Sequence, residues 1–354
     1  MADDSIKQDH LDDNAPLKKA KAIALLSGGL DSNLAVRLML EQGVDVEAVA
    51  VKTPFCDFDC GKGCGHRVKE VADDLSVPLK TLYFGQEYLR MLKRPKFGFG
   101  SGMNPCLDCR SMMYNAAKQY METVGADFIV TGEVLFQRPM SQNFNALEII
   151  EKETGTEGKV LRPLSAKCLP LTDVEKSGCI KRENLCNITG RSRKVQLALA
   201  KRFGIADPPN AAGGCLLTDP QFSRRIRDLM EHIADPLGVP TLNDVELLKV
   251  GRHFRLSSTA KLIVGRNEIE NEIIWSLRLK DDLGMQVKKY PGPSAVLRGC
   301  GYAQSLVHRA AQIVLRYSDC PRGKESSVEI TFNGQVSDIL AVPFVDDELE
   351  ALRI

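Results

Sequence analysis

A short turn rich in Ser and Gly constrains the fold of this 354-residue chain more than any other feature. It has the sequence Ser27-Gly28-Gly29-Leu30-Asp31-Ser32, with an apolar run over residues 22–26 before it and an amphipathic run over residues 33–40 after it. This order predicts a strand, a tight turn and a helix. Two glycines let the backbone approach a ligand closely, and the free N–H groups at a helix start favour an anion.

The polar side chains of the turn narrow the choice of anion. Ser27 and Ser32 can donate hydroxyl hydrogen bonds, whereas Asp31 repels an anion unless a metal ion lies between them. Such a cradle suits a diphosphate bridged to Mg²⁺. The chain contains neither the P-loop spacing G-x-x-x-x-G-K-S/T nor the dinucleotide spacing G-x-G-x-x-G. A turn of this composition can also be an ordinary connection between a strand and a helix.

The six residues resemble the pyrophosphate loop of the PP-loop ATPases, the S-G-G-x-D-S family. The resemblance implies an adenine nucleotide alpha hydrolase-like fold, with ATP and Mg²⁺ as cofactors. It also implies cleavage of ATP between the α- and β-phosphates, which leaves an adenylated substrate and pyrophosphate. The residues expected to bind the nucleotide are Ser27, Gly28, Gly29, Asp31, Ser32 and Gly132, and Asp31 is also expected to act in catalysis.

From residue 21 the chain alternates between short apolar strands and helices. Strands are expected at 22–26, 46–52, 79–84 and 127–131, and helices at 33–41, 67–75 and 112–124. This alternation predicts an α/β domain whose parallel sheet is covered on both faces. Ligands of such sheets bind beyond the carboxyl ends of the strands. The residues expected at that edge are Ser27, Cys56, Cys60, Cys64 and Gly132.

The chain divides into three expected parts. Residues 1–20 form a charged, disordered tail, and residues 21–235 form the α/β catalytic domain. Pro236, Gly238 and Pro240 mark a boundary. Beyond it, residues 240–345 form a smaller α+β domain with short strands and one long helix over residues 301–317.

The composition is that of an ordinary globular protein with about two domains, since 44% of the residues are hydrophobic, 26% are charged and the net charge is +1. No apolar run approaches the ~20 residues that a membrane helix needs. Residues 1–16 contain no apolar leader segment. A cytoplasmic protein without membrane association is therefore expected.

The chain has eleven cysteines. In a reducing compartment such thiols bind metals, act in catalysis or pack in the core more often than they form disulfides. Cys106 and Cys109 form a C-x-x-C just before an expected helix, where the pKa of a thiol is lowered, and Cys215 follows two glycines. Three thiolates with an open position suit an iron–sulfur cluster, and a three-cysteine zinc site is the alternative.

A second group of cysteines, Cys56, Cys60 and Cys64, has uniform spacing and is followed by His66. It lies in a loop rich in Gly and Asp, after the strand expected at 46–52. Zinc or a second cluster could bind these thiols. They could also relay sulfur, or have no functional role.

Several motifs in order resemble the PP-loop tRNA thiolases, namely the 2-thiouridine synthases of the MnmA type and their iron–sulfur-dependent relatives. They are the pyrophosphate loop, Asn104-Pro105 with Cys109, Val130-Thr131-Gly132, and the distant Cys215, and they cover roughly residues 21–220. In the MnmA pattern, the cysteines that match Cys109 and Cys215 carry persulfide chemistry. This chain has Cys106 where that pattern has aspartate, which favours a 4Fe–4S cluster bound by Cys106, Cys109 and Cys215.

This resemblance implies tRNA as the substrate. Adenylation would turn a uridine carbonyl oxygen into a leaving group, and a sulfur nucleophile would then displace AMP. Mg²⁺ near Asp31 would stabilise the pyrophosphate. The sulfur would come from free sulfide or from a partner protein, such as a cysteine desulfurase or a sulfur carrier.

Two polar stretches leave their role open. Arg162 and Lys167 could contact phosphate or the adenylate, or could be solvated surface. Residues 137–142 follow Gly132 and could help to hold ATP or the target base, or could form an ordinary loop.

The C-terminal part is basic. Residues 250–325 contain thirteen Lys/Arg against seven Asp/Glu, a local charge of +6, which is an electrostatic footprint for an RNA backbone. The segment also resembles the NFACT-type RNA-binding domain through Val264-Gly265-Arg266-Asn267, Asn271, Asp281-Asp282 and Tyr290-Pro291-Gly292-Pro293. It departs from that family at Gly284 and Gln286, where the family has an aromatic residue and a histidine.

The expected phosphate contacts in this part are Arg252, Arg255, Arg266, Lys288, Lys289 and Arg298. The histidines and the single tryptophan, Trp275, are expected to be packing or surface residues.

Together these features predict an ATP-dependent tRNA sulfurtransferase. An alternative is a PP-loop ligase or amidotransferase that acts on a small molecule, which would need neither Cys215 nor RNA binding. Another is an RNA-binding factor whose nucleotide domain serves as a switch.

Overall fold

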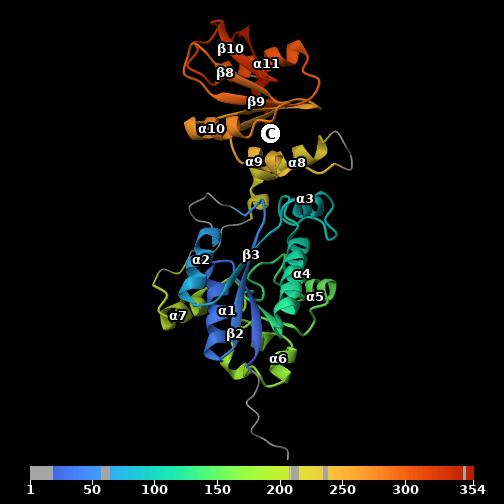
Figure 1. Ribbon diagram of the computed structural model, residues 1–354, viewed down its shortest axis with the longest axis vertical. Coiled ribbons are helices and arrows are strands. Elements are labelled where there is room, and N and C mark those ends of the chain that lie inside the picture. Colours follow the sequence, from blue (N-terminus) through green and yellow to red (C-terminus); the bar gives the residue numbers. More distant parts are fainter. Residues whose placement is uncertain (1–18, 57–63, 207, 209–214, 234–237, 346–347) are drawn as a thin grey trace, which may run out of the picture. The chain divides into compact units, whose positions relative to one another are not determined.

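The computed structural model describes residues 19–56, 64–206, 208, 215–233, 238–345 and 348–354 (Figure 1). Contacts divide it into two compact units. Unit 1 comprises residues 1–51, 64–82 and 110–212, and unit 2 comprises residues 52–63, 83–109 and 213–354. The division is not contiguous along the chain, so the boundary expected at residues 235–240 stays a prediction. The tail expected over residues 1–20 lies almost wholly outside the described residues.

Unit 1 is built on a five-stranded sheet in the order β3-β2-β1-β4-β5. Its strands are β1 (Lys21–Leu25), β2 (Asp45–Lys52), β3 (Leu79–Tyr83), β4 (Phe128–Thr131) and β5 (Val160–Leu161). β1 pairs in parallel with β2 and β4, and β4 pairs in parallel with β5. The predicted α/β fold with a parallel sheet is confirmed.

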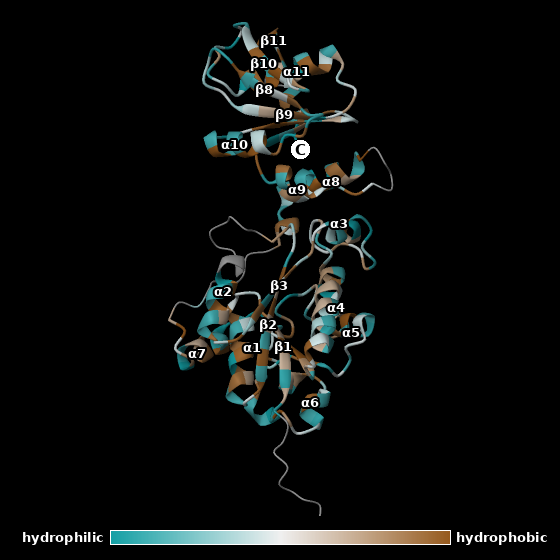
Figure 2. Ribbon diagram, in the orientation of Figure 1, coloured by the Kyte–Doolittle hydropathy of each residue, from teal (hydrophilic) through white to brown (hydrophobic). Residues whose placement is uncertain are grey.

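Helices cover both faces of this sheet, as Figure 1 shows, with α1, α2 and α7 on one side and α4 and α5 on the other. Their bounds are α1 (Leu30–Glu41), α2 (Cys64–Asp74), α4 (Cys106–Val124), α5 (Phe144–Thr154), the short α6 (Asp173–Lys176) and α7 (Lys194–Arg202). β4 is buried along its whole length, as expected for a strand covered on both faces. Figure 2 shows hydrophobic residues along the strands and hydrophilic residues on outer helix turns.

The start of α4 differs from the prediction. The helix was expected from residue 112, but it begins at Cys106, so that Cys106 and Cys109 lie within its first turn. The buried Asp108 carboxylate accepts hydrogen bonds from the backbone N–H groups of Lys96 (2.8 Å) and Phe97 (3.1 Å). An acidic residue in the first turn also suits the positive end of the helix dipole. The C-x-x-C motif is therefore held on one helix face rather than on a loop.

Unit 2 contains a six-stranded sheet in the order β11-β10-β8-β9-β7-β6, in which neighbouring strands are antiparallel. Its strands are β6 (Arg252–Ser257), β7 (Ala260–Val264), β8 (Leu283–Val287), β9 (Ser294–Gly299), β10 (Ser326–Phe332) and β11 (Gln335–Ala341). One face packs against α11 (Gln304–Arg316), and the other packs in part against α10 (Glu268–Ser276). A short helix, α12 (Leu349–Leu352), follows. The predicted α+β domain is confirmed.

Unit 2 contains three further helices, α3 (Gln86–Lys93), α8 (Pro220–Glu231) and α9 (Leu242–Leu248). Lys93 Nζ donates to the carbonyl of Met230 (2.7 Å), and Gln86 Nε2 donates to that of Pro240 (2.8 Å). These bonds tie residues 83–109 to the segments that follow Cys215 within one unit.

Across the described residues, no helix combines the length and the apolar character required to span a bilayer.

Candidate functional site

The Ser27–Ser32 loop forms the predicted turn between β1 and α1, and its own hydroxyl groups hold it. Ser32 Oγ donates to the carbonyl of Gly29 (2.9 Å) and accepts from the N–H of Ser27 (3.2 Å). Gly28 has φ +77°, a conformation that L side chains rarely adopt. The loop backbone is therefore fixed before any ligand arrives.

Gly132 lies directly against this loop. A Cβ atom on Gly132 would stand 2.4 Å from the backbone N of Ser32 and 2.6 Å from the carbonyl carbon of Asp31. Because β1 and β4 are neighbours in the sheet, the turns after them meet at one edge. The structure thus brings together all six residues predicted to bind the nucleotide.

Asp31 has one oxygen engaged and one without a partner. Gln137 Nε2 donates to Asp31 Oδ2 (2.8 Å), while Asp31 Oδ1 is buried and has no hydrogen-bond partner among the described residues. Burial raises the pKa of Asp31, although Gln137 and the nearby Arg193 and Arg138 oppose the rise. A buried carboxylate oxygen without a donor fits a hard cation such as Mg²⁺.

Two glutamines beside Asp31 also present buried amide atoms without partners among the described residues. They are Gln137 Oε1 and both amide atoms of Gln196, whose side chain is fully buried. Sequence reasoning had placed Gln137 in a polar loop of open function and had overlooked Gln196. The one signal in the sequence that could have indicated Gln196 is a polar side chain on the buried face of the amphipathic helix α7. The edge of the sheet therefore offers polar groups to a ligand.

Arg162 is neither a phosphate contact nor solvated surface, contrary to both expectations. It is buried and donates to Glu133 Oε2 (3.0 Å), Glu151 Oε1 (2.5 Å) and Tyr114 Oη (3.1 Å). Although burial raises the pKa of Glu133, Arg110 and Arg162 hold it below its usual value. Arg162 is thus a structural residue, since its charge is already compensated.

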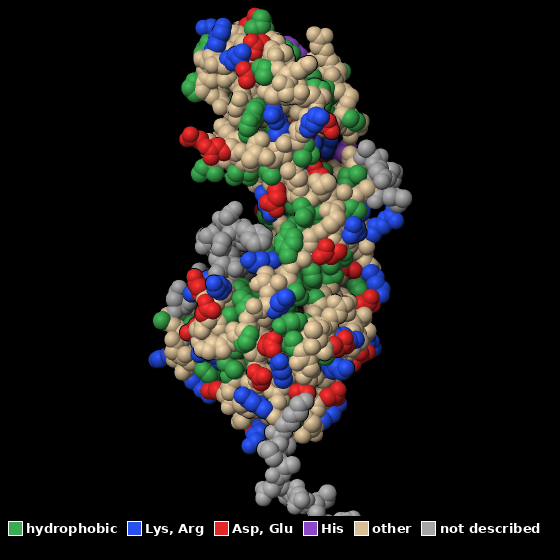
Figure 3. Space-filling view, in the orientation of Figure 1, with side chains coloured by type: hydrophobic (Ala, Val, Ile, Leu, Met, Phe, Trp, Pro, Cys, Tyr) green, Lys and Arg blue, Asp and Glu red, His purple; other side chains and the backbone are tan. Residues whose placement is uncertain are grey.

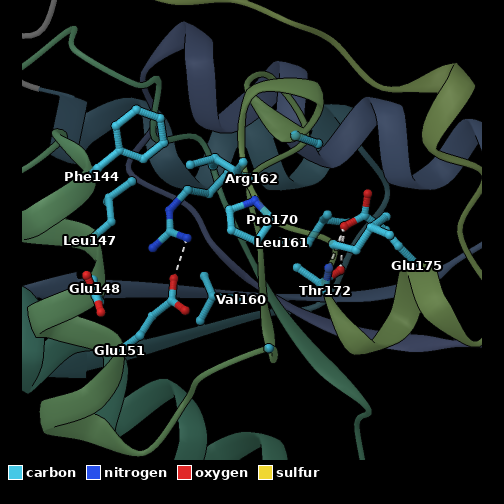
Figure 4. Close-up of a pocket in the computed structure, with 14 residues that line it drawn as sticks. Phe144, Leu147, Glu148, Glu151, Val160, Leu161, Arg162, Pro170, Thr172 and Glu175 are labelled. Carbon is cyan, nitrogen blue, oxygen red and sulfur yellow. Dashed lines mark hydrogen bonds and ion pairs between the residues drawn. The ribbon is translucent and has the colours of Figure 1, made fainter.

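A cavity of about 300 Å³ lies beside this network (Figure 4). Arg162 and Glu151 form an ion pair on its wall, and most of the other lining residues are apolar, including Phe144, Leu147 and Val160. The cavity contains none of the predicted nucleotide or cysteine residues.

Three cysteines of unit 2, Cys106, Cys109 and Cys215, lie near one another. The pKa of Cys215 is raised to about 12, mainly by burial and in part by the neighbouring thiols of Cys109, Cys56 and Cys106. Tyr88 is buried beside the same thiols and shares a hydrogen bond with Cys109. Cys106, Cys109 and Cys215 are thus brought into one neighbourhood, as the sequence analysis expected.

Cys56 belongs to the same neighbourhood, although the sequence placed it in a separate group. Its Sγ accepts from the N–H of Thr53 (3.2 Å) in a tight turn. The adjacent Phe55 ring packs against Tyr88 (5.6 Å between centroids) and Phe222 (6.0 Å). Cys60 lies outside the described residues, and Cys64 begins α2 with a side chain that the structure does not describe.

The thiols of Cys106 and Cys109 at the first turn of α4 are donors of the type that binds zinc or an iron–sulfur cluster. The nine cysteines whose side chains are described are all free thiols. Within the described part of the chain, no three Cys, His, Asp or Glu side chains already stand in an arrangement that could hold a metal ion.

The predicted RNA contacts are mostly engaged within unit 2. Arg298 pairs with Asp282 (2.6 Å) and Asp244 (2.8 Å), and Arg255 pairs with Asp228 (2.5 Å). In the view of Figure 3, Lys/Arg and Asp/Glu side chains are interspersed. RNA contact by these residues stays a prediction, and Arg298 is the least available because its side chain is only 15% exposed.

The other four predicted RNA contacts are Arg252, Arg266, Lys288 and Lys289, and three of them contact another side chain of unit 2. Arg266 pairs with Glu270, and Lys288 pairs with Asp338 (2.8 Å). Arg252 stacks on the Tyr317 ring (4.5 Å from Arg252 Cζ to the ring centroid), and Lys289 is exposed.

Two family models match the chain. The model described as "Thiamine biosynthesis protein (ThiI)" matches residues 18–167, and the model described as "NFACT protein RNA binding domain" matches residues 251–353. Both predicted resemblances are confirmed.

Relatives named tRNA-specific 2-thiouridylase MnmA also match. The protein of Roseiflexus sp. (strain RS-1) is 25% identical over 252 residues, which are 66% of this chain and 67% of that protein. The protein of Legionella pneumophila (strain Lens) is 36% identical over 124 residues, which are 32% of this chain and 34% of that protein. Among the most similar relatives, the chain spans from 34% to 73% of their own length.

A solved structure described as the U34-tRNA thiolase NcsA from Methanococcus maripaludis with its 4Fe-4S cluster is also similar. Its sequence identity is 16%, and the match covers 61% of this chain and 74% of that chain with a TM-score of 0.31.

Replacement of Gly132 by Ala tests the contact between β4 and the loop. The added methyl group must displace the Asp31–Ser32 backbone, so we expect Mg²⁺-ATP to bind at least about tenfold more weakly, which is ~1.4 kcal/mol. Isothermal titration calorimetry measures this affinity. Gly85→Ala is the control, because its Cβ would meet only the ends of flexible side chains, Tyr83 at 3.2 Å and Leu242 at 3.7 Å, and no part of the loop. Unchanged affinity in Gly132→Ala would contradict the proposed nucleotide site.

Buried Lys261 predicts a pH dependence of stability. Burial lowers its pKa to about 7 from 10.5, although Asp228 lies 3.5 Å away. Between these values only the unfolded chain keeps the proton, so the free energy of unfolding should rise with pH, by at most about 1.4 kcal/mol per pH unit. Urea denaturation between pH 7 and 10 measures this slope. Lys261→Met should flatten it, and the exposed Lys280→Met should not; equal slopes in both variants would refute the assignment.

Proposed function

We propose that the chain is an ATP-dependent tRNA sulfurtransferase, which adenylates a uridine carbonyl and replaces its oxygen with sulfur. The observation that carries the proposal is the gathering of Cys106, Cys109 and Cys215 in a chain that also holds an S-G-G-x-D-S loop. The relatives named tRNA-specific 2-thiouridylase and the match to an RNA-binding domain support tRNA as the substrate.

The nucleotide loop supplies the binding groups for activation. The hydroxyls of Ser27 and Ser32 and the N–H groups at the start of α1 would hold the phosphates of ATP. Asp31 would hold Mg²⁺ through its unpartnered Oδ1, with Gln137 orienting the carboxylate from the other oxygen. Mg²⁺ would neutralise charge on the departing pyrophosphate. Because Gly132 packs against the loop backbone, the N–H groups would keep their positions, whereas the Ser32 hydroxyl would turn from the Gly29 carbonyl to the phosphate.

The thiols supply the sulfur chemistry. In one route Cys109 carries a persulfide, whose terminal sulfur attacks the adenylated carbon and displaces AMP. Cys215 then attacks Cys109 Sγ, forms a disulfide with it and releases the thiocarbonyl, and a thiol reductant restores the pair. In the other route Cys106, Cys109 and Cys215 hold a 4Fe–4S cluster, which would supply an iron without a protein thiolate as the binding place for sulfur. The donor set at the start of α4 favours the cluster route.

The remaining assignments belong to the same proposal. Residues 21–235 would form the catalytic domain and residues 240–345 the RNA-binding domain. The two family models cover parts of these ranges, namely residues 18–167 and residues 251–353. A cysteine desulfurase or a sulfur carrier would deliver the sulfur, in the cytoplasm.

Metal analysis of anaerobically purified protein tests the cluster. We expect about four iron atoms and about four acid-labile sulfides per chain. Cys215→Ala should lose both, whereas Cys300→Ala, which alters an exposed thiol, should keep them. Zinc is measured in the same samples. Absence of iron after reconstitution would overturn the cluster route.

Thiolation of unmodified tRNA with ATP and sulfide tests the function itself. Thionucleoside should form with wild-type protein and fall by at least about a hundredfold in Cys109→Ala, since a group central to the reaction is removed. If reconstituted protein forms no thionucleoside with either sulfide or a persulfide donor, the proposed activity is wrong.

Cys56→Ala tests whether Cys56 belongs to the same site. We expect reduced iron retention and an altered electron paramagnetic resonance spectrum of the reduced cluster, because Cys56 lies beside the thiols that would bind it. Cys179→Ala, at another exposed thiol, is the control. An unchanged spectrum and iron content would separate Cys56 from the site.

A further inference from the structure

We propose that Trp275 and Arg278, stacked against Gly284 on the open face of the antiparallel sheet, form a binding site for an unpaired RNA base. This inference deepens the proposed function, on which it rests for the identity of the nucleic acid. It gives the single tryptophan of the chain a binding role rather than one in packing.

The two side chains form a stacked pair at the end of α10. Arg278 Cζ lies 4.4 Å from the centroid of the Trp275 ring. Both residues are partly exposed. Arg278 Nη1 is buried and has no hydrogen-bond partner among the described residues. A buried donor without an acceptor is uncommon in a folded domain, so stacking holds the guanidinium here although one hydrogen bond is unmade. A base would reach the pair through its partly exposed atoms.

Gly284 on β8 makes room for this pair. A Cβ atom there would stand 2.6 Å from Arg278 Nη1 and 3.0 Å from two carbons of the Trp275 ring. Any larger residue would therefore displace the stack. The aromatic surface thus comes from α10 in this chain, over a strand position that has no side chain.

The sheet face beside the stack is open. Gly284 is paired with Val296 on one side and with Thr331 on the other, and residues directly opposite each other share a face. Val296 packs with Ile274 of α10, which identifies the face that α10 covers. Farther along this face, β11 is uncovered, and Val336 and Leu340 are 61% and 56% exposed.

Charge on this face favours stacking over phosphate binding. The row of Gly284, Thr331 and Val336 is neutral. The next row places Glu329 and Asp338 on the same face, where both pair with Lys288. Exposed carboxylates would repel a phosphate backbone. A neutral base can instead stack on aromatic and guanidinium planes, an interaction worth about 1–3 kcal/mol per base.

The single tryptophan makes the native chain its own reporter, because all tryptophan fluorescence comes from Trp275. Full-length protein is titrated with an unstructured ten-nucleotide single-stranded RNA and with a duplex of the same sequence. We expect saturable quenching by the single strand and much less by the duplex, whose bases are already stacked.

Variants are compared by the anisotropy of a labelled single strand. Trp275→Ala and Arg278→Leu should weaken binding by about 5- to 150-fold, which corresponds to 1–3 kcal/mol. Trp275→Phe should retain most of the affinity. Leu279→Ala, a neighbouring exposed side chain outside the stack, is the matched control.

A folded Trp275→Ala protein that binds the single strand as tightly as wild type would overturn the proposal. If that variant does not fold, Gly284→Ala is tested instead, because it keeps the Trp275 fluorophore and displaces Arg278. Quenching by the single strand that is as strong in Gly284→Ala as in wild type would also overturn the proposal. Absence of thionucleoside in the tRNA assay, with quenching retained, would reject the sulfurtransferase and leave the base site standing.

Discussion

The contact between Gly132 and the Asp31–Ser32 backbone is the constraint on which the proposed nucleotide site depends. It exists because β1 and β4 are parallel neighbours, so that the turns that follow them meet at one sheet edge. A side chain at position 132 would separate those turns. The same edge presents Asp31 Oδ1 and Gln137 Oε1 as buried acceptor atoms without partners among the described residues. Pairing of two strands thus places the helix-start N–H groups and these oxygens at one edge.

Buried charge shapes the rest of the molecule in a way that composition alone does not indicate. Arg162 satisfies two carboxylates and a phenol within unit 1, and Arg298 joins two carboxylates within unit 2. A guanidinium suits such positions because its several donors lie in one plane. Removing one partner would leave a buried charge uncompensated, which commonly costs about 3–5 kcal/mol. Basic residues that seem suited to phosphate are therefore partly committed to holding the fold together.

Much of the fold could be predicted from local pattern, and the differences have physical causes. The strands at the centre of unit 1 were placed to within one or two residues, because covered parallel strands are short continuous apolar runs. The start of α4 was predicted six residues too late, although Pro105 directly precedes the helix, a position where proline is tolerated. Helices α3 and α9 are only 8 and 7 residues long, and packing within unit 2 stabilises them.

The sequence by itself determined the α/β and α+β classes and the turn at Ser27–Ser32, since each follows from a local pattern of residues. It also indicated Cys106, Cys109 and Cys215 as the candidates for sulfur chemistry. Only the tertiary structure decided that Cys56 joins those cysteines and that Trp275 covers Gly284. It also decided that Arg162 faces Glu133 rather than a phosphate. These facts are contacts between residues far apart in the chain or on different elements. Strand order and helix packing set such contacts, and no local pattern of residues encodes them.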